Sequence, residues 1–124
     1  MKILIVENDK SIIRSITDIM LSFFTEVSSH YFYGFQNGKN IYKIISVGAM
    51  CDLLVVDCGP KTIGGLDLIK KIKSDEKLSH IPIIAMSGYP IDEKKAMIAG
   101  ANDFILKPFD LDELIKKINK LINP

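Results

Sequence analysis

The chain has 124 residues, of which 48% are hydrophobic and 25% are charged, and these values indicate one globular domain rather than a disordered chain. Its 16 basic and 15 acidic residues give a formal net charge of +1, which offers no electrostatic case for direct contact with nucleic acid. The cysteines, Cys51 and Cys58, are too few and too close for a disulfide scaffold, and no Cys/His spacing suggests zinc. The apolar run at the N-terminus is too short for a signal peptide or a membrane span, so we expect a cytoplasmic protein without membrane contact.

Four short apolar runs predict buried strands. They lack the strict alternation of a half-exposed strand, and continuous apolar runs are typical of strands covered on both faces, as in a parallel sheet. A further strand is expected in the aromatic stretch 26–38, where both faces carry aromatic residues and the register stays open. The four runs are Ile3–Val6, Leu53–Val56, Ile81–Ala85 and Phe104–Leu106.

Helical patterns of apolar residues separate these runs. Gly100 is expected to end one helix as a C-terminal cap, and Asp110 with Glu113 resembles a capping box at the start of the last helix. The expected helices are Ile12–Phe23, roughly Asn40–Val47, Leu66–Ile72, Asp92–Ala99 and Leu111–Ile122.

The alternation of strand and helix predicts the fold class. It indicates an α/β fold with one doubly wound parallel sheet, helices on both faces and right-handed crossovers. In such a sheet the reactive site lies at the carboxyl ends of the strands, near the switch in strand order.

Polar side chains stand directly after the predicted strands. Chance places a polar residue at one strand end, because turns are polar, but it rarely supplies carboxylates, a hydroxyl and an ammonium together. These residues are Glu7, Asn8 and Asp9 after the first run, Asp57 and Ser87 after later ones, and Lys107 after the last.

This set of groups indicates phosphoryl chemistry. Glu7 and Asp57, with Asn8 or a water, can supply hard oxygen ligands to Mg²⁺. Asp57 can act as a nucleophile toward phosphorus and form an acyl phosphate. Mg²⁺ and Lys107 would offset charge on the phosphoryl oxygens, and Ser87 can donate a hydrogen bond to one of them.

Five stretches of the sequence resemble one known family. They are "KILIVEND", "DLLVVD", "GGLDLIKKIK", "IPIIAMSGY" and "GANDFILKPF", in order and at near-normal spacing. Over nearly its full length the chain resembles the receiver domain of two-component response regulators, so residues 1–124 are expected to form a single receiver domain. The resemblance implies a flavodoxin-like fold with five strands in the order 2-1-3-4-5.

The resemblance also implies roles for the residues around Asp57. Asp57 would accept a phosphoryl group from a phosphohistidine on a sensor histidine kinase or a phosphotransfer protein. Glu7 and Asn8 fall on the acidic pair that helps to hold Mg²⁺, and Gly59 would give a backbone carbonyl to the metal. The protein would then be a phosphoprotein and a switch with self-phosphorylation and self-dephosphorylation, not a conventional turnover enzyme.

Other positions match the family's switch residues and its output. Ser87 falls on the switch hydroxyl, Phe104 on the aromatic switch position and Lys107 on the family's lysine, whose bond to Pro108 is expected to be cis. Gly88 would leave room for the phosphoryl group. Output would pass through an unidentified partner protein or a further output domain, and a homodimer stays open.

The chain departs from the family pattern in four places, one of which is Phe104, because it lacks the hydroxyl of the more common Tyr. Asn8 replaces an acid, which predicts weaker Mg²⁺ binding. Pro60 lies three rather than four residues beyond Asp57, so the turn after Asp57 is expected to be reshaped. The stretch from Ser87 to Lys107 is two residues shorter than usual, which makes the choice of partner by analogy unsafe.

Competing readings remain for the whole chain and for single residues. A degenerate receiver that acts as a phosphorylation-independent interaction module is the alternative function, favoured by Asn8 and the altered Asp57 turn. A flavin or nucleotide enzyme on this topology would need a Gly-rich phosphate loop after the first strand, and acids stand there instead.

Cys58 is expected to be a packed thiol rather than a redox sensor, and Phe104 is equally well a core aromatic.

Overall fold

The computed structural model describes residues 2–23, 31–35, 42, 51–62 and 64–123. Within these residues, no helix is long and apolar enough to cross a membrane. The elements, in chain order, are β1 (Lys2–Val6), α1 (Lys10–Phe23), β2 (Tyr31–Phe35), β3 (Leu53–Asp57), α3 (Gly65–Ser74), β4 (Ile83–Ser87), α4 (Ile91–Ala99), β5 (Asp103–Leu106) and α5 (Leu111–Ile122).

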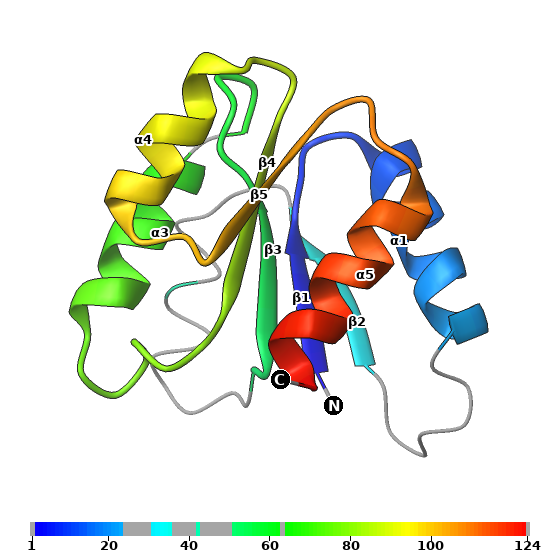
Figure 1. The fold of residues 1–124 in the computed structure, drawn as a ribbon, viewed down its shortest axis with the longest axis horizontal. Helices are drawn as coiled ribbons and strands as arrows, with labels where there is room; N and C mark the ends of the chain where they lie inside the picture. Colours follow the sequence, from blue (N-terminus) through cyan, green and yellow to red (C-terminus); the bar gives the residue numbers. More distant parts are fainter. Residues whose placement is uncertain (1, 24–30, 36–41, 43–50, 63, 124) are drawn as a thin grey trace.

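The strands form one parallel sheet between two layers of helices. Every pair of neighbouring strands is parallel, and the order is β2-β1-β3-β4-β5, the order that the family resemblance implies. Figure 1 shows α3 and α4 on one side of the sheet and α1 and α5 on the other. Because β1 and β3 are neighbours, their carboxyl ends bring the residues after both strands to one point of the sheet edge.

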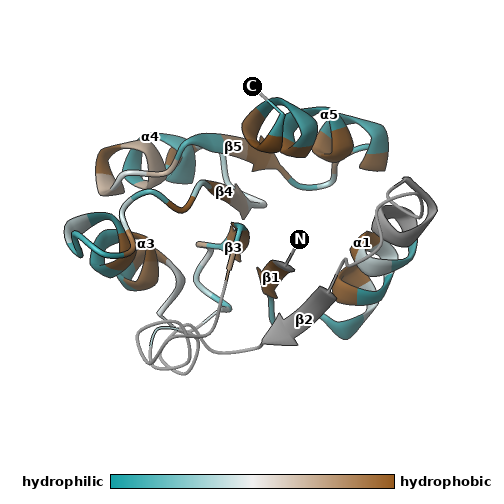
Figure 2. Cartoon of the chain, turned by 90° about the horizontal axis from the view of Figure 1, so that it is seen from below, coloured by the Kyte–Doolittle hydropathy of each residue, from teal (hydrophilic) through white to brown (hydrophobic). Residues whose placement is uncertain are grey.

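Successive residues of the strands belong to two separate cores. In β1, Leu4 and Val6 pack on the α3/α4 side, whereas Ile3 and Ile5 pack on the α1/α5 side. Figure 2 shows the hydrophobic stripes of α3 and α5 turned toward the sheet. Both faces of the strand are therefore buried, which explains the continuous apolar runs and confirms the predicted parallel sheet with helices on both faces.

The α3/α4 layer begins close to the backbone of β3. A Cβ on Gly65, the first residue of α3, would lie 2.0 Å from the carbonyl oxygen of Asp57. At the far end of α4, Gly100 has φ 114° and its N–H bonds to carbonyls of the last turn, as predicted for the C-terminal cap.

Two local predictions were wrong. The strand expected at Ile81 begins at Ile83, because Pro82 has no N–H to give to the sheet; its carbonyl accepts the N–H of Leu54. Asp110 is the N-cap of α5 but makes no side-chain capping bond, so the expected capping box does not form. Of the helix expected at roughly 40–47, only Tyr42 is among the described residues.

Candidate functional site

A polar cleft of about 370 Å³ opens at the carboxyl ends of the strands. The predicted metal-binding residues and Lys107 line it together, whereas Ser87 lies beside it. Its lining consists of Glu7, Asn8, Asp9, Ile12, Asp57, Gly59, Pro60, Lys61, Gly88, Tyr89 and Lys107.

Glu7 follows β1 and is fully buried. Its Oε1 accepts the backbone N–H groups of Asn8 and Asp9 at 3.0 and 3.1 Å, and its Oε2 accepts a short hydrogen bond from Lys107 Nζ. Burial raises the pKa of Glu7 above its usual value and the charge of Asp57 adds to this, while the bond from Lys107 opposes it. The carboxylate is thus held in one orientation by three donors.

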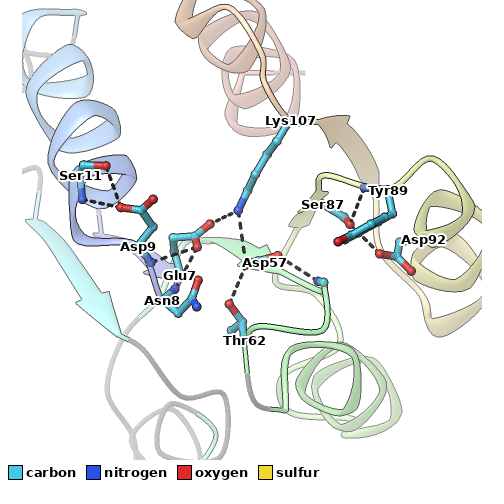
Figure 3. A network of polar contacts seen from close by, with 11 residues as sticks. Glu7, Asn8, Asp9, Ser11, Asp57, Thr62, Ser87, Tyr89, Asp92 and Lys107 are labelled. Atoms are coloured by element: carbon cyan, nitrogen blue, oxygen red, sulfur yellow. Dashed lines mark hydrogen bonds and ion pairs between the residues drawn. The ribbon is translucent and has the colours of Figure 1, made fainter.

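Asp57 is the last residue of β3 and is 4% exposed. Its Oδ1 accepts the N–H of Gly59 at 2.9 Å. Its Oδ2 accepts the hydroxyl of Thr62 at 2.6 Å and lies 3.3 Å from Lys107 Nζ (Figure 3). Thr62 was not predicted: the early Pro60 indicates an altered turn, but no sequence signal says which side chain of that turn reaches Asp57.

Lys107 directly follows β5 and joins the two carboxylates. Its backbone N–H donates to the carbonyl of Ser87 at 2.8 Å, which holds the ends of β4 and β5 together, and its bond to Pro108 is cis, as predicted. The ammonium pairs with both Glu7 and Asp57, and its side chain is 18% exposed. One cation therefore faces two nearly buried anions, which leaves the floor of the cleft with a net negative charge.

The hydroxyl of Ser87 is bonded to Asp92 rather than to Asp57. Ser87 ends β4 and is fully buried; its Oγ donates to Asp92 Oδ2 at 2.6 Å and accepts the N–H of Tyr89 at 3.1 Å (Figure 3). Asp92 was not predicted as a partner, because an acid in the first turn of a helix is accounted for by the helix dipole alone.

Gly59 keeps a space open between Asp57 and Ser87. A Cβ on Gly59 would lie 3.2 Å from Asp57 Oδ1 and 3.4 Å from Ser87 Oγ, whereas a Cβ on Gly88 would meet nothing within 4 Å. Gly59 therefore leaves room between Asp57 and Ser87, while Gly88 lines the same cleft against open space, and its role toward a phosphoryl group stays a prediction.

Few side chains in the cleft could coordinate a metal ion. Among the described residues, no group of three His, Cys, Asp or Glu side chains could hold a metal ion. Asp9 also lines the cleft, and its Oδ1 caps α1 through the N–H and hydroxyl of Ser11, which lower the pKa of Asp9. Two carboxylates, an amide and a carbonyl nevertheless suit Mg²⁺, which keeps several waters and needs only one or two carboxylates.

Cys58 and Phe104 both pack in the core on the α3/α4 side. Burial, with the nearby charges of Asp92 and Asp57, raises the pKa of the Cys58 thiol to about 11, so the thiol stays protonated at neutral pH, as expected of a packed cysteine. Phe104, on β5, is 7% exposed and belongs to the core on the α3/α4 side.

The comparison with curated proteins finds response regulators. The two-component response regulator PhoP of Pseudomonas aeruginosa is 38% identical over 71 residues, 57% of this chain and 32% of PhoP. CrdR, a transcriptional regulatory protein of Helicobacter pylori, is 33% identical over 98% of this chain and 55% of its own length. The chemotaxis protein CheY of P. aeruginosa is 28% identical, with 98% and 95% covered. The chain thus spans about a third of PhoP, about half of CrdR and nearly all of CheY.

Solved structures share the fold. The signal receiver domain of a DNA-binding response regulator from Colwellia psychrerythraea has a TM-score of 0.85 at 23% identity, with 100% of this chain and 99% of that chain covered. The receiver domain of a P. aeruginosa sensor histidine kinase, solved with a magnesium ion in its active site cleft, has a TM-score of 0.76 at 24% identity, with 99% and 98% covered. The family profile of the response regulator receiver domain matches residues 3–119. The chain therefore belongs to the response regulator receiver domain family.

Proposed function

We propose that this receiver domain is a phosphoacceptor and that Asp57 is the residue phosphorylated. The observation that carries the proposal is the arrangement around Asp57: a nearly buried carboxylate, 3.3 Å from an ammonium, beside a space that a side chain on Gly59 would fill. A carboxylate in this position can act as a nucleophile, and the open space gives the incoming group a place to lie.

In the proposed reaction a carboxylate oxygen of Asp57 attacks the phosphorus of a phosphohistidine. The new O–P bond forms as the P–N bond breaks, and its electron pair leaves with the imidazole nitrogen. Lys107 offsets negative charge on the transferring oxygens. Glu7 holds Lys107 through its hydrogen bond and thereby orients the ammonium.

Mg²⁺ is the proposed cofactor, and it would supply further positive charge to the phosphoryl oxygens. Glu7, Asp57, Asn8 and the Gly59 carbonyl would hold it. Binding is expected to be weaker than is usual in the family, because the amide of Asn8 brings no charge to the ligand set.

The proposed partners follow from the reaction and from the family. The phosphoryl donor would be a sensor histidine kinase or a phosphotransfer protein in the cytoplasm, and the domain would be a switch rather than a turnover enzyme. Ser87 and Phe104 are the proposed switch residues. The output would be a partner protein or an output domain, as the regulatory relatives suggest, and a homodimer is compatible with this scheme.

A second candidate is an interaction module that works without phosphorylation. It is favoured by Asn8 and by the engagement of both reactive side chains, since Thr62 donates to Asp57 and Asp92 accepts from Ser87.

Acetyl phosphate separates the two candidates. Wild type and Asp57→Asn are incubated with acetyl phosphate, with and without Mg²⁺, and the masses of the intact proteins are measured by mass spectrometry. A phosphoacceptor gains one phosphoryl group in the presence of Mg²⁺, and Asp57→Asn gains none. Wild type that gains none, under conditions that label another receiver domain, supports the interaction module.

A further inference from the structure

The hydroxyl of Ser87 has a partner that competes with any phosphoryl group. A serine hydroxyl carries one proton, so it can donate one hydrogen bond at a time. Ser87 Oγ donates that proton to Asp92 Oδ2, and the 2.6 Å between the two oxygens is typical of a strong hydrogen bond to a charged acceptor. The same Oγ also accepts the N–H of Tyr89. The single donor proton of Ser87 is therefore already used, with nothing left to donate toward Asp57.

Ser87 nevertheless lies beside the space where a phosphoryl group on Asp57 would be. The position of the missing Cβ of Gly59 is 3.4 Å from Ser87 Oγ and 3.2 Å from Asp57 Oδ1. A group attached to Asp57 and filling this space comes within hydrogen-bond reach of the hydroxyl once Ser87 leaves Asp92. The Ser87 hydroxyl cannot donate to the Asp92 carboxylate and to a phosphoryl oxygen at the same time.

We propose that Asp92 is a positioning residue that holds the Ser87 hydroxyl in the unphosphorylated arrangement and thereby lowers the affinity of the site for a phosphoryl group. The proposal rests on the proposed function of Asp57. The Ser87–Asp92 bond exists only before the exchange, so its free energy opposes the phosphorylated form. Because Asp92 lies in the first turn of α4, the exchange also removes a bond between the site and that helix.

The test uses beryllofluoride, an analogue of the phosphoryl group on a carboxylate, because its binding is an equilibrium that requires no transfer chemistry. Affinity in the presence of Mg²⁺ is measured for wild type and Asp92→Ala. The matched control is Glu93→Ala, which removes an acid from the same turn; the structure gives the exposed Glu93 side chain no bond to Ser87. Both variants replace an acid by alanine, the best helix former, so α4 is kept.

We expect Asp92→Ala to bind beryllofluoride about tenfold more tightly than wild type and Glu93→Ala. Tenfold corresponds to about 1.4 kcal/mol, near the lower limit for a hydrogen bond to a charged group, as suits the partly exposed Asp92. In a Ser87→Ala background the same substitution should change the affinity by less than about twofold, a result that a merely structural role of Asp92 would not give.

Each outcome decides the proposal. If wild type binds and Asp92→Ala binds no more tightly than Glu93→Ala, Asp92 does not hold the hydroxyl back, while the proposed function stands. If the gain persists without the Ser87 hydroxyl, the proposal is equally overturned. If neither wild type nor Asp92→Ala binds, both the proposed function and this inference fail. Binding by Asp92→Ala alone supports the inference in its strongest form.

Discussion

Removal of the Lys107 ammonium is the sharpest test of how the cleft is stabilised. Within the described part of the chain, Lys107 is the cation that pairs with both Glu7 and Asp57, whose side chains are 0% and 5% exposed. Lys107→Met keeps the aliphatic stem and removes the charge, so two carboxylates remain close together without a counterion. The free energy of unfolding should therefore fall.

The expected loss of unfolding free energy in Lys107→Met follows from how deeply its ion pairs are buried. Removing one partner of a fully buried ion pair costs about 3–5 kcal/mol. Lys107 is 18% exposed and the cleft opens to water, and Glu7 Oε1 keeps its two backbone donors, so the cost lies below that range. We expect a loss of about 2–3 kcal/mol in urea unfolding monitored by circular dichroism without divalent cations.

Lys117→Met is the matched control. Lys117 pairs with Asp103 at 3.1 Å, but the two side chains are 25% and 32% exposed, so the loss should be no more than about 1 kcal/mol. Asp57→Asn in the Lys107→Met background should recover part of the stability, because it removes one of the two facing charges. Equal losses for the two lysine variants, or no recovery by Asp57→Asn, would refute this account of the cleft.

Three further predictions concern single groups in the site. Thr62→Val should lower the free energy of unfolding by about 1–2 kcal/mol, because the nearly buried Asp57 loses a donor, while Thr62→Ser should stay near wild type; equal losses would show that packing decides. Asn8→Asp should raise Mg²⁺ affinity in calorimetric titration by about fivefold, since a charge near a divalent ion is worth about 1 kcal/mol or more in water-like surroundings; no change would place Asn8 outside the ligand shell. The raised pKa of Glu7 means that the folded state binds the Glu7 proton more readily than the unfolded state does. The stabilisation that comes from this proton is therefore complete below pH 4.5 and is lost as the pH rises through the folded-state pKa. The unfolding free energy of wild type minus that of Glu7→Gln should therefore fall with rising pH in that window when measured without Mg²⁺, and a flat difference would count against a raised pKa.

The fold could be predicted because the signals that specify it are local and repeated. Strands buried on both faces give continuous apolar runs, and α5 carries an apolar stripe that packs on the sheet. The parallel arrangement then places Glu7, Asp57 and Lys107 at one edge, since all three follow or end strands whose carboxyl ends coincide.

The hydrogen-bond partners within the site could not be predicted in the same way. Thr62 and Asp92 each lie five residues beyond the group they contact, in a turn and in the first turn of a helix, where polar residues are ordinary. The direction of such side chains depends on a few backbone dihedral angles in the turn. The hydrophobic periodicity of the sequence carries no information about these angles. The same limit applies to Asp110, whose sequence context favoured a capping bond that the geometry of the turn does not make.

Gly65 brings the start of α3 directly against the backbone of β3. With only 2.0 Å between the position of its absent Cβ and the Asp57 carbonyl oxygen, no side chain fits, so the first turn of α3 packs on the backbone of Asp57 without a side chain between them. The first turn of α4 is instead connected to the site through a side-chain bond that a competing acceptor can exchange. We therefore expect the two helices of this layer to report events at Asp57 unequally: hydrogen exchange should change at the start of α4 and stay constant at the start of α3. A partner that binds α4 could then distinguish two states of the domain, whereas one that binds the start of α3 would meet the same surface in both.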